Sequence, residues 1–197
     1  MAEMKKIRKK EESPSRYLYY VGNMLIGIAL ASLLVTLLPL TKAFLFPQAF
    51  VSERHQTNGL YITIPKIHAQ AAIVDNVDPL NEAEYSQALK KGIAHARSTS
   101  LPGEQGTIFL FAHSSGMPWD LTWYNTIFLR LDELQIGDQI TLFRDGKKFV
   151  YSVDNKKVVW PQDTSYLQEK KETRLILQTC YPIGTSFQRL LVFARPQ

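Results

Sequence analysis

The chain has 197 residues, of which 45% are hydrophobic and 21% are charged. This length allows one folded domain with an appendage, and the composition excludes a disordered or collagen-like chain. A single cysteine excludes an intramolecular disulfide framework and a Cys-based zinc site. Residues 1–16 hold six Lys or Arg and three Glu and so carry much of the net charge of +5. The basic balance therefore does not indicate a nucleic-acid partner.

An uncharged, apolar segment lies near the N-terminus, from Tyr17 to Thr41. About 20 helical residues span the ~30 Å hydrocarbon core of a bilayer. The basic residues before the segment predict a cytoplasmic N-terminus by the positive-inside rule. A cleaved signal peptide is the alternative, but its apolar region is normally shorter and ends in a small-residue site. We predict a single-pass protein of the cell membrane with a basic cytoplasmic tail over 1–16, a transmembrane helix over 17–41, a spacer over 42–58 and an extracytoplasmic domain over 59–197.

Short apolar runs separated by turn residues dominate the chain after Gly59. A helix is expected from an Asn81 cap through Leu89, the Asp145-Gly146 pair predicts a hairpin, and 126–134 is either helical or irregular. About eight strands with little helix predict a mainly all-β fold, a small closed barrel rather than an alternating α/β sheet. The strands identified individually are 60–64, 71–77, 107–113, 138–144, 147–159, 174–180 and 188–195.

Cys180 ends one of these strands, directly before Tyr181-Pro182. A lone cysteine is more often a small buried hydrophobe than a nucleophile. Its position at a strand end, in a domain expected outside the membrane where an idle exposed thiol is oxidised, favours a functional thiol. Such a nucleophile needs a base or cationic partner, usually a histidine.

The chain offers four histidines as that partner. His113 ends an apolar strand and can project from a barrel rim. His55 lies in the spacer, His68 follows the first strand, and His95 is expected in a turn at 92–95. These three are interpreted as solvated or structural histidines.

A short motif surrounds Cys180 and is followed by an arginine. Residues 177–182 read Leu-Gln-Thr-Cys-Tyr-Pro, and with Arg189 nine residues after the cysteine they are similar to the L-x-T-C…R signature of sortases. Upstream, 95–107 and 112–113 resemble the segment leading to the catalytic histidine of that family, and 61–66 resembles its opening strand. The similarity covers most of the predicted outer domain, in the expected order.

This resemblance implies an eight-stranded β-barrel and a transpeptidase that cleaves an LPxTG-type sorting signal through a thioacyl-enzyme. Cys180 would be the nucleophile, His113 the general acid and base, Arg189 the stabiliser of substrate and oxyanion, and Thr179 a substrate-binding residue. The implied partners are secreted proteins that carry the signal and a cell-wall amine such as a peptidoglycan precursor. No cofactor is expected; some members use calcium, but the sequence identifies no site for it.

The spacing of Cys180 and Arg189 supports the pair independently. Their midpoint falls between Gly184 and Thr185, where a turn is natural. If the flanking strands are antiparallel neighbours, the two residues lie opposite each other with Cβ atoms ~5 Å apart. Without the motif, Arg189 would be interpreted as an exposed barrel arginine.

Departures from the family pattern leave the subclass and substrate preference open. Ile176 stands where threonine is commoner, and Ser114 follows His113 where arginine is common. No lid motif is found in 42–58, and the chain ends at Gln197 soon after the last strand. These two features favour a protein-anchoring member over a pilin-polymerising one.

Two other functions remain open at this point. A membrane-anchored cysteine peptidase would hydrolyse its substrate, but it would normally orient its histidine with Asn or Asp. A non-catalytic anchored binding module could use an aromatic platform, although such aromatics more often belong to a core or a cleft wall. The aromatic residues in question are Trp119, Trp123, Tyr124 and Trp160.

Overall fold

The computed structural model describes residues 16–45, 59–113, 127–167 and 172–197. The chain divides into two compact units, Met1–Thr41 and Lys42–Gln197. Most of the predicted spacer lies outside the described residues, so the expectation that it holds no lid is not tested. The loop after His113 also lies outside them, and with it Trp119, Trp123 and Tyr124.

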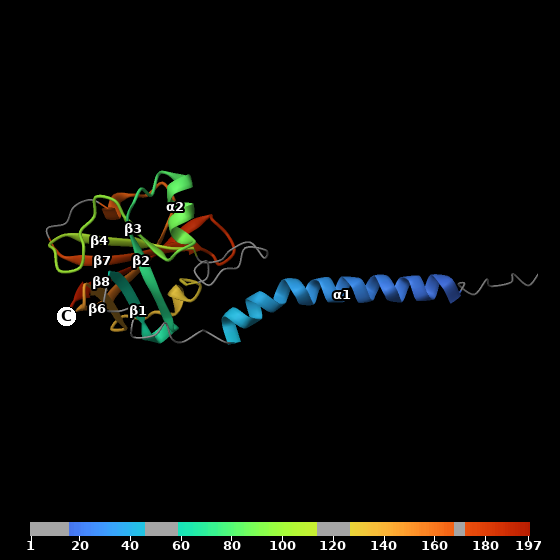
Figure 1. Ribbon diagram of the computed structural model, residues 1–197. Coiled ribbons are helices and arrows are strands. Elements are labelled where there is room, and N and C mark those ends of the chain that lie inside the picture. The colour runs from blue at the N-terminus through green and yellow to red at the C-terminus, as the bar shows by residue number, and fades with distance from the viewer. Residues whose placement is uncertain (1–15, 46–58, 114–126, 168–171) are drawn as a thin grey trace, which may run out of the picture. The chain divides into compact units, whose positions relative to one another are not determined.

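The first unit is built on a single helix, α1 (Arg16–Leu45), drawn in blue in Figure 1. Its segment Arg16–Leu38 is long and apolar enough to cross a membrane. Large apolar side chains of this segment, such as Leu25 and Leu34, are exposed along the helix. A helix that is apolar all round needs an apolar environment, so α1 is a candidate membrane anchor.

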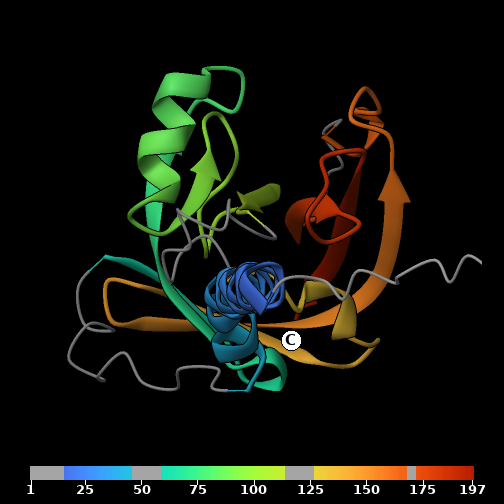
Figure 2. The same ribbon diagram turned by 90° about the vertical axis from the view of Figure 1, so that its right-hand side faces the viewer.

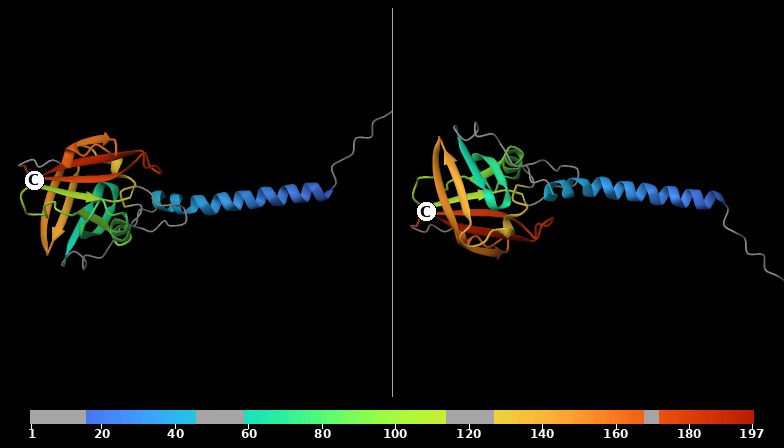
Figure 3. Two further views of the ribbon diagram at one scale, coloured as in Figure 1. Left: turned by 90° about the horizontal axis from the view of Figure 1, so that it is seen from above. Right: turned by 90° about the horizontal axis from the view of Figure 1, so that it is seen from below.

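The second unit is a closed eight-stranded β-barrel, as the sequence predicts, in the order β1-β2-β3-β4-β7-β8-β6-β5. Figure 3 shows this barrel from two opposite sides. Two neighbouring pairs, β2 with β3 and β4 with β7, are parallel, and the other pairs are antiparallel. The strands are β1 (Leu60–Ile64), β2 (Ala69–Val77), β3 (Ile93–Ala96), β4 (Thr107–Phe111), β5 (Gln139–Arg144), β6 (Lys147–Val159), β7 (Arg174–Tyr181) and β8 (Gln188–Pro196).

Alternation along the strands separates the barrel core from its outer surface. Fully buried aliphatic side chains from the strands form one continuous core, for example Ile62, Ile108, Leu142, Leu175 and Val192. Burying each such side chain contributes about 1.5–3 kcal/mol. This packing fixes the register of the strands, because a shift by one residue would turn the core side chains outward.

Two local signals in the sequence are confirmed. Helix α2 (Glu82–Leu89) begins at Asn81, whose side chain accepts a hydrogen bond from the backbone N–H of Glu84 at 3.2 Å. Asp145 and Gly146 both have positive φ, 49° and 77°, as a type I′ hairpin turn between β5 and β6 requires. Helix α2 contacts β2 and β3 on the outside of the barrel.

Three details of the sequence prediction are corrected. The apolar strand expected to reach His113 ends at Phe111, and the strand expected from Ala71 begins at Ala69. His95 lies in β3, a strand that the sequence analysis did not identify, rather than in a turn. In 127–134, the described part of the ambiguous segment, the chain forms turns and a 3₁₀ helix at Leu131–Glu133.

Candidate active site

The parallel pairing of β4 with β7 brings the carboxyl ends of two distant strands to one edge of the barrel. Phe111 of β4 lies opposite Gln178 of β7. The backbone N–H of Ala112 donates to the carbonyl of Gln178 at 3.1 Å, and the Thr179 hydroxyl donates to the carbonyl of Ala112 at 3.0 Å. Ala112 is therefore fixed to β7, and His113 follows it directly beside the strand that carries Cys180.

The antiparallel pairing of β7 with β8 places Cys180 directly opposite Arg189. This confirms the register expected from the nine-residue spacing. The Arg189 Nη1 group donates to the carbonyls of Ser186 and Gln188 at 3.0 and 3.1 Å. One edge of the guanidinium is thus anchored to the preceding loop, which orients the remaining donors. Cys180 is half-buried and carries a free thiol.

Cys180, His113 and Arg189 line one pocket with a volume of about 1010 Å³. Its floor includes Phe109 and Phe111 of β4, which are buried and also belong to the apolar core. One wall comes from α2 and the segment 96–100, and the other from the segment between β6 and β7. Figure 2 shows α2, in green, and the β7–β8 connection, in red, on opposite sides of the end of β4.

The electrostatic influence of Arg189 extends to two tyrosines in this pocket. Burial raises the pKa of Tyr85 and Glu82 raises it further, whereas Arg189 lowers it. Burial also raises the pKa of Tyr166, and Arg189 again acts in the opposite direction. The charged residues among the described lining are Arg97 and Arg189, with no Asp or Glu, so this pocket suits electron-rich groups.

The segment between β6 and β7 is held against the pocket floor at Tyr166. The Tyr166 ring stacks on Phe109 with centroids 5.9 Å apart, and its hydroxyl donates to Gln178 Oε1 at 2.7 Å. Its carbonyl accepts a hydrogen bond from Arg174, whose Nε also donates to the Thr107 hydroxyl at 3.2 Å. Tyr166 is therefore fixed by its ring, its hydroxyl and its backbone.

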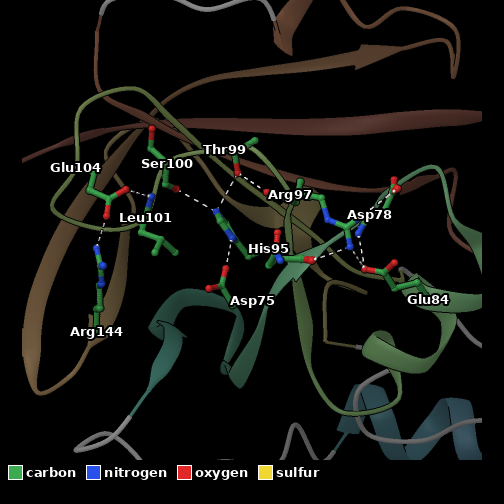
Figure 4. A network of polar contacts seen from close by, with 12 residues as sticks. Asp75, Asp78, Glu84, His95, Arg97, Thr99, Ser100, Leu101, Glu104 and Arg144 are labelled. Carbon is green, nitrogen blue, oxygen red and sulfur yellow. Dashed lines mark hydrogen bonds and ion pairs between the residues drawn. The ribbon is translucent and has the colours of Figure 1, made fainter.

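The opposite wall is held by the polar network of Figure 4. His95 is 3% exposed, and its Nδ1 lies 2.6 Å from Asp75 Oδ1 while its Nε2 lies 3.0 Å from the carbonyl of Ser100. The Thr99 hydroxyl also lies 2.9 Å from Nε2, so both ring nitrogens are engaged in hydrogen bonds. Nearby, Arg97 forms ion pairs with Asp78 and Glu84, which connects the wall to α2. His95 is therefore structural, as expected, although it lies in a strand.

The remaining predicted residues have other surroundings. Thr179 is 3% exposed and its hydroxyl is bonded to the Ala112 carbonyl, so it positions the strand end while its substrate contact stays a prediction. His68 follows the short 3₁₀ helix after β1, and His55 lies outside the described residues. In the described ranges, no three His, Cys, Asp or Glu side chains are grouped to hold a metal ion. The expectation about cofactors stays a prediction.

Sequence reasoning missed Tyr85, Tyr166 and Gln178 as pocket residues. A signal existed for Gln178, because it lies two residues before Cys180 and so points to the same side of β7. Tyr85 and Tyr166 lie on other elements, and their contact with the pocket depends on tertiary packing alone.

Comparison with known proteins agrees with this geometry. The family model of the sortase domain matches residues 62–197. Sortase D of Bacillus subtilis (strain 168) is 34% identical over 152 residues, which cover 75% of this chain and 67% of that protein. Two crystallographic relatives are also similar. Sortase C-1 of Actinomyces oris is 29% identical with a TM-score of 0.59, covering 70% of this chain and 72% of the other.

The second similar crystal structure is that of Clostridium perfringens sortase C with the C-terminal cell wall sorting motif. It is 31% identical with a TM-score of 0.58, covering 70% of this chain and 69% of the other. A thiol, an imidazole and a guanidinium in one pocket can perform acyl transfer through a covalent intermediate. The chain therefore belongs to the sortase family, the cysteine transpeptidases of cell-wall sorting.

Proposed function

We propose that this protein is a membrane-anchored transpeptidase that cleaves an LPxTG-type sorting signal and transfers the acyl part to a cell-wall amine. The observation that carries the proposal is the meeting of Cys180, Arg189 and His113 in one pocket, from β7, β8 and the end of β4. The structure of a relative with its cell wall sorting motif supports this class of substrate. The apolar helix α1 supports the anchored location.

In the first half-reaction, the Cys180 thiolate attacks the carbonyl carbon of the substrate threonine. The negative tetrahedral oxygen is stabilised by Arg189, whose guanidinium is oriented by the carbonyls of Ser186 and Gln188. The tetrahedral state collapses by breaking the peptide bond, and protonated His113 gives its proton to the departing amine. The products are a thioester at Cys180 and a free C-terminal fragment.

In the second half-reaction, the acceptor amine attacks the thioester carbonyl. His113, now neutral, takes a proton from that amine, and the carbon–sulfur bond breaks to return the Cys180 thiolate. The acceptor is an amine of the cell wall, such as that of a peptidoglycan precursor. The apolar floor formed by Phe109 and Phe111 favours the bound peptide over bulk water around the thioester.

The test is mass spectrometry of the full chain in detergent, incubated with an LPxTG-like peptide with and without an added amine. We expect a thioacyl adduct on the Cys180 peptide, and a peptide–amine product that appears only when the amine is present. Cys180→Ala should give neither species while keeping its fold by circular dichroism.

The outcome also separates the other functions raised by the sequence. A hydrolysed peptide with no transfer product would identify a cysteine peptidase. Absence of any adduct or product from a folded chain would favour a binding module. Activity that survives in Cys180→Ala would overturn the proposed nucleophile.

A further inference from the structure

Exposed apolar side chains gather at the edge of the barrel beside the pocket. Val159, at the end of β6, pairs with Arg189 of β8. Tyr181, at the end of β7, pairs with Gln188 of β8. The ends of β6 and β7 therefore meet the start of β8 at one edge, and Figure 2 shows the end of β6, in orange, beside the β7–β8 connection, in red. The exposed side chains at these strand ends and in this connection, named here the apolar rim, are Val158, Trp160, Ile183 and Phe187.

The apolar rim differs from the rest of the barrel surface. Phe187 is 70% exposed and Trp160 is 64% exposed, and the two aliphatic members are each 41% exposed. In the described part of the barrel unit, the other large apolar side chains that are exposed are Leu80 and Ile136. The members of the rim are not among the described residues that line the pocket, so a peptide bound there leaves them uncovered. A cluster of this kind marks a surface that contacts another apolar body.

The flanks of the apolar rim are basic. The positions within two residues of its members are 156–162 and 181–189, and they hold Lys156, Lys157 and Arg189 but no Asp or Glu. Asp163, one position further on, offsets one of these charges through an ion pair with Lys157 at 3.7 Å. Aromatic rings flanked by cations are typical of the membrane–water interface, where the rings lie at headgroup level and the cations meet anionic lipids.

The chain itself brings a bilayer next to the barrel. Helix α1, the candidate anchor, ends at Leu45, and β1 begins at Leu60, so 14 residues, 46–59, separate them. A chain of that length spans at most about 50 Å. Such a tether makes contact between barrel and bilayer an intramolecular event, so even a weak attraction is populated. A partner free in solution would have no such advantage.

We propose that the apolar rim docks onto the outer face of the membrane in which α1 is anchored, with Trp160 and Phe187 at headgroup depth. The inference rests on the membrane anchoring in the proposed function and adds to it an orientation of the barrel on the lipid. Docking in this way turns the edge that carries Cys180 and Arg189 toward the bilayer. A substrate or an acceptor amine that is itself held in the membrane can then reach the thiol.

The test measures contact between single positions and lipid in the full chain. Cys180→Ala removes the one native cysteine, and Phe187→Cys or Lys147→Cys then carries an NBD fluorophore. The chains are reconstituted into vesicles of phosphatidylcholine and phosphatidylglycerol, with or without a phosphatidylcholine that bears a nitroxide near its headgroup. Lys147 is the matched control, because it is exposed and lies at the opposite end of β6. We expect nitroxide quenching at Phe187→Cys to exceed that at Lys147→Cys by about threefold or more.

Two double variants separate docking through the rim from mere proximity to the bilayer, with Ile183→Cys carrying the fluorophore in both. Trp160→Ser with Phe187→Ser should lower the quenching by about threefold, because it removes the two aromatic side chains that would enter the interface. Leu80→Ser with Ile136→Ser removes two exposed apolar side chains outside the rim and should leave the quenching unchanged. Circular dichroism confirms that each variant is folded.

The possible failures are distinct. Equal quenching at Phe187→Cys and Lys147→Cys would overturn the inference and leave the transpeptidase chemistry, measured with Cys180 intact, standing. An equal loss of quenching in the two double variants would also overturn it. Energy transfer between labelled copies without lipid quenching would identify a second copy as the occupant of the rim and overturn the membrane contact. A chain that does not enter vesicles would overturn the proposed anchoring, and the inference with it.

Discussion

Replacing Arg189 by alanine should lower the rate of thioacyl formation by roughly 200-fold. Arg189 lies opposite Cys180 in the β7–β8 pair, which places their Cβ atoms ~5 Å apart. A unit charge ~5 Å from the tetrahedral oxygen, at an effective dielectric constant of ~20, stabilises it by about 3 kcal/mol. This agrees with the ~10²–10³-fold cost of removing one oxyanion donor. The assay is quenched single-turnover mass spectrometry of the Cys180 thioester.

Arg189→Lys separates the charge from the geometry. Arginine donates from Nη1 to the carbonyls of Ser186 and Gln188 and still presents further donors, whereas lysine is a single flexible point charge. We expect Lys to be almost as slow as Ala. Arg195→Ala, on the same strand and 70% exposed, is the control and should be near normal.

Two results would refute this reasoning. Near-normal thioacyl formation in Arg189→Ala would mean that Arg189 is a surface residue of the pocket. Nearly full activity in Arg189→Lys would mean that a point charge beside Cys180 is sufficient, and that the anchored guanidinium has no orienting role. Circular dichroism of each variant distinguishes both results from misfolding.

Three further predictions concern the barrel and its histidines. His113→Ala should abolish turnover with unchanged thermal stability. His95→Ala should lower the free energy of unfolding by about 3 kcal/mol, because it removes a buried ring whose two nitrogens are both hydrogen-bonded. If urea titrations showed His113→Ala to be the destabilised variant and His95→Ala to be the inactive one, the two roles would be exchanged. Gly92→Ala should destabilise the barrel by about 2–4 kcal/mol, since its Cβ would lie 2.2 Å from the carbonyl oxygen of Ala72. A urea midpoint equal to that of the wild type would contradict this close contact. Burial raises the pKa of Tyr151 to about 12, so the unfolded chain loses this proton first and stability should fall between pH 10 and 12, by up to about 3 kcal/mol. In Tyr151→Phe this part of the fall in stability should be absent. An equal fall in the wild type and in Tyr151→Phe would show that Tyr151 does not cause it.

The fold was largely predictable because most strands carry their own signals. The strands at Leu60–Ile64 and Lys147–Val159 were located to the residue, since β-branched and aromatic runs there are bounded by Pro65 and by the Asp145-Gly146 turn. Strand β3 was missed because its four residues are all buried and show no alternation. It is a strand only because β2 and β4 flank it.

The site was predictable where its residues are close in sequence. Cys180 and Arg189 belong to one hairpin, so their separation alone gives their register. The Tyr166–Gln178 and Asp75–His95 contacts join residues on different elements, 12 and 20 positions apart. No local pattern encodes such contacts, because they arise from the closure of the barrel.

The parallel pairing of β4 with β7 has a consequence for the order of folding. The Cys180–Arg189 contact forms within one hairpin, whereas the Thr179–Ala112 bond, which holds the end of β4 beside β7, joins residues 67 positions apart. Closing that long loop costs more entropy than forming a hairpin, and parallel pairing of distant strands is slow. We therefore expect Cys180 to come beside Arg189 early in folding and beside the end of β4, which leads to His113, late. On the proposed mechanism, the pair of thiol and imidazole would be completed only when the barrel closes.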